Sequence, residues 1–123
     1  MLKDFYTTLH SQQIDTTRYE IDILLNENHE IFKGHFPNFP ITPGVCMLQI
    51  IKNFSEEIIG EKLFMSKTSN VKFMALINPK ENAKLKLSLE IIPNENGTWV
   101  VKNTTSFGDT IALKLTNTYQ ALC

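Results

Sequence analysis

Three of the five prolines of this chain fall within one short stretch, at Pro37, Pro40 and Pro43. Each proline lacks a backbone N–H and biases the residue before it toward extended geometry, so the stretch 35–43 cannot form the interior of a helix. A long, largely apolar segment follows and ends at Gly60, a residue suited to stopping a helix. Thr42 can cap that segment with Pro43 at the first helical position. The sequence therefore predicts a stiff loop followed by a helix over 43–59.

The first half of this helical segment is apolar on every side. The residues that make it so are Val45, Cys46, Met47, Leu48, Ile50 and Ile51. A helix that is hydrophobic all round is buried all round. In a chain of 123 residues, such burial requires a sheet that curls around the helix, with a second subunit as a further cover for what the sheet leaves open.

Most of the remaining chain has the pattern of β-strands. Over 18–25 and 84–92, apolar and polar side chains alternate with the period of two that is typical of a half-buried strand. Further strands are expected over 62–66, 71–77, 98–107 and 110–121, with a tight turn at Gly108-Asp109. These elements predict a single domain, 1–123, in which an antiparallel meander follows one buried helix. Residues 1–12 form an N-terminal extension to which no structure is assigned.

Charge and hydropathy exclude two classes of partner. The chain carries 12 Lys and Arg against 13 Asp and Glu, for a formal net charge of −1, which argues against a surface dominated by the basic residues that nucleic-acid binding requires. No apolar run approaches the roughly 20 residues that span a bilayer, and the N-terminus lacks the residue order of a signal peptide. We therefore expect a cytoplasmic protein that neither binds nucleic acid nor inserts into a membrane.

The cysteines and histidines form no disulfide or metal pattern. Cys46 and Cys123 are too few for a disulfide framework. The histidines, His10, His29 and His35, lack the spacing of metal ligands, and we predict no metal. Cys46 falls in the first turn of the predicted helix, where a Cys-His nucleophile is conceivable, but its apolar surroundings favour a packed core thiol.

The proline-rich stretch also carries a candidate for chemistry. His35 lies on the stiff loop that leads directly into the helix. The first N–H groups of a helix have no partner within it and favour negative charge. One interpretation is a base placed beside an oxyanion site. The other is that the prolines only shape a crossover and His35 is a packed loop histidine, and the spacing alone leaves both open.

The stretch 35–45 resembles the signature of the β-hydroxyacyl-acyl-carrier-protein dehydratases of type II fatty-acid synthesis. That signature runs His-Phe-Pro-Gly-x-Pro-x-x-Pro-Gly-Val, and the chain departs from it only at Asn38, a residue type that tolerates the left-handed backbone of a glycine. Downstream, Val71-Lys72-Phe73 and the turn Asn78-Pro79 resemble the next strands of the family. The resemblance implies an α+β hot-dog fold, in which an antiparallel sheet wraps around one long central helix. It also implies a homodimer or higher homo-oligomer with active sites at the dimer interface.

A site and a reaction follow from the same resemblance. His35 matches the histidine that acts on the α-proton of a 3-hydroxyacyl thioester. The N–H groups of Gly44 and Val45 would bind the thioester carbonyl, where an enolate-like oxyanion develops. The residues expected to line the acyl tunnel are Phe36, Phe39, Met47 and Phe73. The implied reaction eliminates water from a substrate carried by acyl-carrier protein or coenzyme A, gives a trans-2-enoyl thioester and needs no cofactor.

One position departs from the family in a way that bears on catalysis. The helix carboxylate of the family lies six residues after the last motif proline, and that position is Gln49 here. An amide can orient a hydroxyl or a water, but it cannot supply a proton as a general acid. Three interpretations stay open: His35 shuttles the proton while Gln49 from the other subunit positions the hydroxyl, the site hydrolyses thioesters, or the protein is a non-catalytic acyl-binding or partner subunit.

Overall fold

A computed structural model of the chain describes residues 3–33 and 41–122. In chain order the elements are β1 (Tyr6–Gln13), β2 (Arg18–Leu25), α1 (Glu30–Lys33), α2 (Gly44–Ile59), β3 (Leu63–Phe73), β4 (Lys84–Pro93), β5 (Thr98–Phe107) and β6 (Thr110–Ala121). The predicted strands over 18–25, 98–107 and 110–121 are confirmed at these bounds, and the strand over 84–92 extends by one residue.

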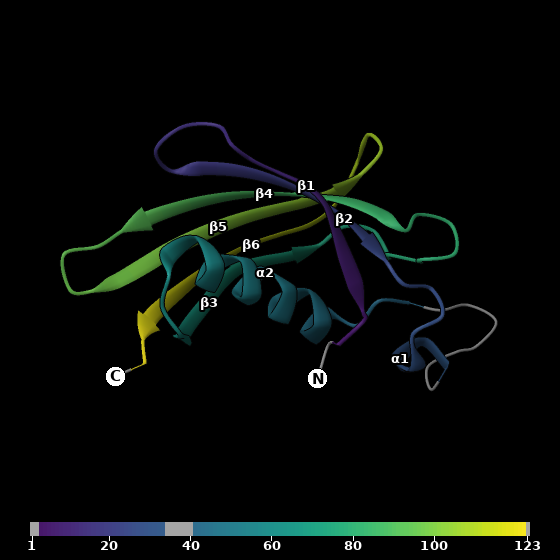
Figure 1. Ribbon diagram of the computed structural model, residues 1–123, viewed down its shortest axis with the longest axis horizontal. Helices are drawn as coiled ribbons and strands as arrows, with labels where there is room; N and C mark the ends of the chain where they lie inside the picture. Colours follow the sequence, from purple (N-terminus) through teal and green to yellow (C-terminus); the bar gives the residue numbers. More distant parts are fainter. Residues whose placement is uncertain (1–2, 34–40, 123) are drawn as a thin grey trace.

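The strands form one six-stranded antiparallel sheet in the order β1-β2-β4-β5-β6-β3. Helix α2 lies across one face of this curved sheet, and the other face is left open (Figure 1). Strands β4, β5 and β6 are the expected meander, joined by short turns at Gly97 and Gly108, where φ is 71° and 55°. An antiparallel sheet that wraps around one long helix is the hot-dog arrangement that the resemblance implied.

The core lies between the sheet and α2. Alternate side chains of β2, β4 and β6 face the helix and are buried, as the period-two pattern predicts. The helix side chains buried against them are Met47, Ile50, Ile51 and Phe54. Each such side chain contributes roughly 1.5–3 kcal/mol when fully buried. This packing holds α2 against the sheet and so positions the N-terminus of the helix, where the candidate site lies.

The start of α2 differs from the prediction by one residue. Pro43 occupies the cap position in extended geometry, Gly44 is the first helical residue, and no described side chain caps the helix. Thr42 lies one residue before this cap, so its hydroxyl is not in the capping position; its backbone N–H donates to the carbonyl oxygen of Ile77 at 2.8 Å. The predicted stop is confirmed, since Gly60 adopts left-handed geometry and its N–H donates to Glu56 O at 2.8 Å.

Within one chain the sheet does not bury α2 on every side, and the expectation that a second subunit covers the rest stays a prediction. The Val45 side chain is 67% exposed, and Leu48 and Gln49 are only half-buried. The sheet covers one face of the helix, and its opposite face stays open in a single chain. Within residues 3–33 and 41–122, no helix has the length and apolarity needed to cross a membrane.

Strand β3 replaces the two short strands expected over 62–66 and 71–77. It is one edge strand, Leu63–Phe73, with irregular pairing between Met65 and Lys67 and between Ser69 and Lys72. The polar stretch in its middle hides the strand from pattern analysis because an edge strand has little buried surface to mark with apolar residues. Residues 74–77 leave the strand and run past the start of α2.

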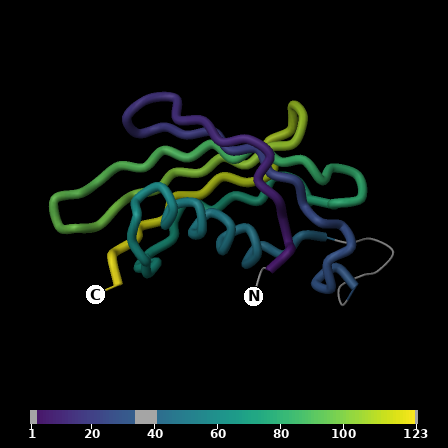
Figure 2. Tube along the Cα trace, in the orientation of Figure 1, coloured from purple at the N-terminus to yellow at the C-terminus, as the bar shows by residue number. Residues whose placement is uncertain are grey.

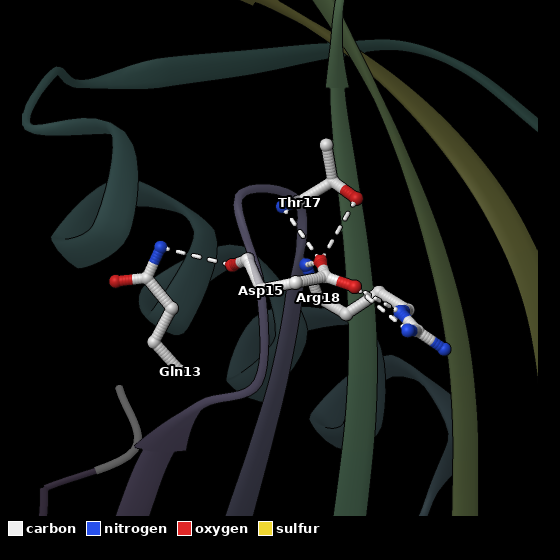
Figure 3. Close-up of polar contacts among 4 residues, drawn as sticks. All are labelled: Gln13, Asp15, Thr17 and Arg18. Atoms are coloured by element: carbon white, nitrogen blue, oxygen red, sulfur yellow. Dashed lines mark hydrogen bonds and ion pairs between the residues drawn. The ribbon is translucent and has the colours of Figure 1, made fainter.

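The N-terminal extension contains a strand that the sequence did not predict. Strand β1 pairs with β2 at the other edge of the sheet and is almost entirely exposed, so it shows no apolar alternation. The turn into β2 is fixed by Asp15, whose carboxylate accepts the N–H groups of Thr17 and Arg18 at 3.0 and 2.9 Å and forms an ion pair with the Arg18 guanidinium at 2.7 Å (Figure 3). These donors lower the pKa of Asp15 to about 2, with the Arg18 side chain as the largest cause.

Candidate functional site

An apolar cleft of about 440 Å³ opens at the N-terminus of α2. One side is the segment that enters the helix together with its first turn, and the other is the end of β3 with the segment after it. The lining residues are Ile41, Thr42, Pro43, Gly44, Met47, Phe73, Met74, Ala75, Leu76 and Ile77. The cleft therefore lies where the proline-rich stretch was expected to meet the helix.

Gly44 and Phe73 approach each other closely in the lining of this cleft. A Cβ atom added to Gly44 would lie 2.8 Å from Phe73 Cζ, closer than side-chain carbons normally approach. A glycine at the first position of α2 thus lets the aromatic ring pack directly against the helix backbone. Met47, one turn further along, is buried to 1% exposure beneath them.

Two backbone N–H groups in the first turn of α2 have no acceptor among the described residues. The N–H groups of Cys46 and Met47 donate to Pro43 O at 3.0 and 3.4 Å. Those of Gly44 and Val45 make no hydrogen bond to any described residue outside the helix, and at this position they have no acceptor within it. Two N–H donors at a helix N-terminus favour a negatively charged or strongly polarised oxygen.

Thr42, which the sequence predicted as a helix cap, instead adds a polar group to the cleft. Its Oγ1 is buried and has no hydrogen-bond partner among the described residues. Such a group costs free energy unless a partner arrives. Thr42 lines the cleft next to Gly44 and is a polar residue in an otherwise apolar lining. The sequence marks it only as a small polar residue between Ile41 and Pro43.

Gln49 lies on a different part of the helix and does not line the cleft of its own chain. Its side-chain Nε2 donates to Asn53 Oδ1 at 2.9 Å, and Asn53 Nδ2 donates to the hydroxyl oxygen of Tyr6 at 3.3 Å. The expectation that Gln49 serves the site of a second subunit stays a prediction. Asn53 and Tyr6 were not found from the sequence because 47 positions separate them.

The predicted site residues divide into three groups. Gly44, Met47 and Phe73 meet at one cleft, with Val45 next to it on the helix, while Gln49 stands apart. The remaining three, His35, Phe36 and Phe39, lie outside the residues that the structure describes.

Cys46 is buried in the first turn of α2, and burial raises the pKa of its thiol. A raised pKa keeps the sulfur protonated near neutral pH, which disfavours a role as nucleophile. Over residues 3–33 and 41–122, no three His, Cys, Asp or Glu side chains cluster in a way that would hold a metal ion.

Comparison with protein families and curated proteins gives a consistent result. Residues 11–111 match the model of the ApeI-like family, described as ApeI dehydratase. Among curated relatives, the 3-hydroxyacyl-acyl-carrier-protein dehydratase FabZ of Levilactobacillus brevis is 29% identical, over 69% of this chain and 61% of its own length. FabZ of Lactococcus lactis subsp. cremoris is also 29% identical, over 86% of this chain and 78% of the relative. The chain thus spans about three fifths of the first of these proteins.

Solved structures share the fold. The dehydratase heterocomplex ApeI:P from Xenorhabdus doucetiae superposes with a TM-score of 0.74 at 20% identity, covering 93% of this chain and 96% of the other. A hypothetical thioesterase from Streptococcus pneumoniae, solved with coenzyme A, gives a TM-score of 0.71 at 10% identity, covering 99% and 91%. These likenesses confirm the hot-dog fold, and the match over residues 11–111 shows that the chain belongs to the ApeI-like dehydratase family.

Proposed function

We propose that the protein is a 3-hydroxyacyl-thioester dehydratase of fatty-acid or related lipid or polyene biosynthesis, with acyl-carrier protein or coenzyme A as carrier. The observation that carries this proposal is the pair of N–H groups of Gly44 and Val45, which no described residue accepts, beside an apolar cleft lined by Gly44. An acyl thioester requires both features, a polar cradle for its carbonyl and an apolar place for its chain.

The proposed reaction balances with one histidine. The neutral imidazole of His35 takes the α-proton, and the electron pair moves onto the thioester oxygen, which the N–H groups of Gly44 and Val45 bind. The carbonyl then re-forms, the bond from C3 to the hydroxyl oxygen breaks, and His35 returns its proton to the leaving hydroxyl. Water and a trans-2-enoyl thioester result, and no external acid is consumed. Gln49 orients the hydroxyl but does not supply a proton.

We also propose that two copies of this 1–123 unit pair so that Gln49 of one serves the cleft of the other. Strand β3 is an edge of the sheet and presents unpaired backbone groups. The exposed large apolar side chains on β3 and just after it are Phe64, Val71, Phe73, Met74 and Leu76. Their concentration at one edge supports an interface between copies of the chain.

Two other functions share this site. Gln49 in place of a carboxylate favours either hydrolysis of the thioester, with the amide orienting a water, or a subunit that holds an acyl group without turning it over. Both alternatives rest on Gln49. A general acid or base contributes roughly 10² to 10⁴-fold to the rate of dehydration, and the Gln49 amide cannot supply that contribution.

Hydration of enoyl thioesters, the reverse reaction, separates the three. Crotonyl and longer enoyl thioesters of acyl-carrier protein and coenzyme A are incubated with the wild type and His35→Ala. The dehydratase predicts hydration by the wild type alone. Release of free carrier thiol by the wild type would indicate a thioesterase, and no turnover by either protein would indicate a non-catalytic subunit.

Sedimentation velocity tests the proposed pairing. A charge at the β3 edge, Val71→Glu, should convert a dimer into a monomer because it places an unpaired carboxylate in an apolar contact. Leu24→Glu is the matched control, since Leu24 is similarly exposed, 42% against 41% for Val71, but lies on β2. Equal effects of the two substitutions would argue against β3 as the interface.

A further inference from the structure

We propose that Tyr6 and Asn53 are positioning residues for Gln49, so that strand β1 holds the site amide in one orientation. This inference rests on the proposed function for its chemical meaning, but the contacts that carry it belong to the fold. Tyr6 lies outside the stretch 11–111 that matches the family. The proposal therefore assigns a role to a part of the chain that the resemblance does not cover.

The three side chains form one continuous hydrogen-bonded row. Gln49 Nε2 donates to Asn53 Oδ1 at 2.9 Å, and Asn53 Nδ2 donates to Tyr6 Oη at 3.3 Å. Gln49 and Asn53 are four residues apart on α2 and therefore neighbours on one face of the helix. Tyr6 is the first residue of β1, which runs upward from the N-terminus past α2 (Figure 2).

The far end of the row is anchored by packing. The ring of Tyr6 contacts that of Phe54, with centroids 5.7 Å apart and planes inclined by 57°. Phe54 is 4% exposed and belongs to the core under α2. Just before Tyr6, Phe5 is fully buried and stacks on Phe32 at 5.3 Å, so the backbone that carries the phenol is fixed as well.

This row determines what Gln49 can offer a substrate. With Nε2 bound to Asn53, the carbonyl oxygen Oε1 is an acceptor that no described side chain uses. A glutamine on a half-buried helix face would otherwise sample many rotamers, and fixing it during binding costs side-chain entropy. Here the fold fixes the rotamer in advance, which is the requirement for a group that must meet a reacting atom.

In the proposed reaction the fixed acceptor has a definite use. Gln49 Oε1 accepts the proton of the substrate 3-hydroxyl, which turns a lone pair of that hydroxyl oxygen toward the imidazolium of His35. The proton taken from the α-carbon is then delivered to the leaving oxygen, and every proton is accounted for. Tyr6 touches no reacting atom and acts only through Asn53 and Gln49.

A double-mutant cycle tests the functional part. Tyr6→Phe keeps the ring and removes the hydroxyl, and should lower kcat about 5- to 10-fold, the range expected for one lost hydrogen bond, while KM changes less than about twofold. In a Gln49→Ala background the same substitution should have no further effect. Tyr19→Phe is the matched control, because Tyr19 is a half-buried tyrosine of β2 that makes no hydrogen bond to this row within the described chain. A loss that is unchanged in the Gln49→Ala background would overturn the proposal.

A second measurement does not depend on activity. In ¹⁵N-labelled protein the side-chain amide of Gln49, identified by its disappearance in Gln49→Ala, should exchange with water more slowly than those of the exposed Gln12 and Gln120. Tyr6→Phe should shift this resonance and speed its exchange, while Tyr19→Phe should not. If the wild type hydrates no enoyl thioester but the amide responds in this way, the dehydratase is wrong and the positioning stands. An amide that ignores Tyr6→Phe overturns the positioning whatever the activity.

Discussion

Phe73 Cζ lies 2.8 Å from the point that a Cβ atom of Gly44 would occupy. The aromatic ring therefore rests on the backbone of the first helical residue, at the cleft beside two N–H groups that no described residue accepts. Phe73 is nonetheless 60% exposed within a single chain, so no described residue of its own chain holds the ring from the outer side. This contact joins the motif glycine to the end of β3 within the lining of the cleft.

Gly44→Ala is expected to push the Phe73 ring away from α2. Because the ring is partly exposed and can yield, the loss in free energy of unfolding should lie near the low end for overpacking, about 1 kcal/mol. The activation free energy of enoyl-thioester hydration should rise by more than the free energy of unfolding falls, since the ring moves within the cleft. Chemical denaturation and the hydration assay measure the two effects.

The companion variant is Phe73→Leu, which shortens the side chain at the contact. In that background Gly44→Ala should cost measurably less stability than in the wild type, because the clashing atom is gone. An equal cost in both backgrounds would place the strain in the helix backbone and not at Phe73.

Gln49→Glu is expected to raise dehydratase activity by roughly 10² or more, the range that a general acid or base supplies. The structure indicates how the new side chain would fit. A carboxylate cannot donate as Gln49 Nε2 does to Asn53 Oδ1, so the Asn53 amide must reverse and donate to the new carboxylate, while its oxygen accepts from the Tyr6 hydroxyl. The hydration assay and its pH profile measure the gain.

Asn53→Asp in the Gln49→Glu background provides the contrast. Two carboxyl groups four residues apart on α2 would repel and raise each other's pKa, and the carboxylate introduced in place of the Asn53 amide would have no N–H to donate. The gain from Gln49→Glu should therefore be reduced in this double variant. No gain in Gln49→Glu alone would count against the placement of Gln49 at a site.

The sequence predicted the inner part of this fold better than its edges. The alternation that marks 84–92 exists because one face of β4 packs on α2 and the other meets water. The edge strands β1 and β3 lack that asymmetry, and so β1 was missed and β3 was divided into two. Exposure on both faces removes the hydrophobic signal on which strand prediction depends.

The candidate site was predictable where its residues are close in sequence. Gly44 and Met47 share one helical turn, and the resemblance added Phe73. The contact between Asn53 and Tyr6 could not be inferred, because it depends on how β1 crosses α2 and not on any local pattern. The burial of the Thr42 hydroxyl was missed for a similar reason: it depends on the segment after β3, where Ile77 accepts the Thr42 N–H, and on a helix that begins one residue later than the local capping preference predicts.

Asp15→Asn is expected to remove a pH-dependent part of stability. The folded pKa of Asp15 is about 2, below its ordinary value of 3.8, so the carboxylate contributes stability that is complete above about pH 4 and is lost as the pH falls through about 2. The wild type should therefore melt above Asp15→Asn near neutral pH, and the gap in Tm should close toward pH 2. Calorimetry across this pH range measures it.

Arg18→Met checks the same contact from its other side. Removing the guanidinium that lies 2.7 Å from Asp15 raises the Asp15 pKa toward its ordinary value, so in this background the gap should be smaller and should close at a higher pH. A gap between wild type and Asp15→Asn that stays constant down to pH 2 would contradict the assignment.

Cys46→Ala is expected to retain activity and to lose about 1 kcal/mol of stability, the cost of removing one buried side-chain atom. Burial raises the pKa of this thiol, so in a Cys123→Ser background a thiol reagent at neutral pH should label Cys46 only when the protein unfolds. The same cysteine lies in the first turn of α2, beside the proposed carbonyl cradle, where a reactive thiolate would change the chemistry of the site. Rapid labelling of the native protein, or loss of hydration activity in a Cys46→Ala protein that melts normally, would show that the sulfur takes part in the reaction.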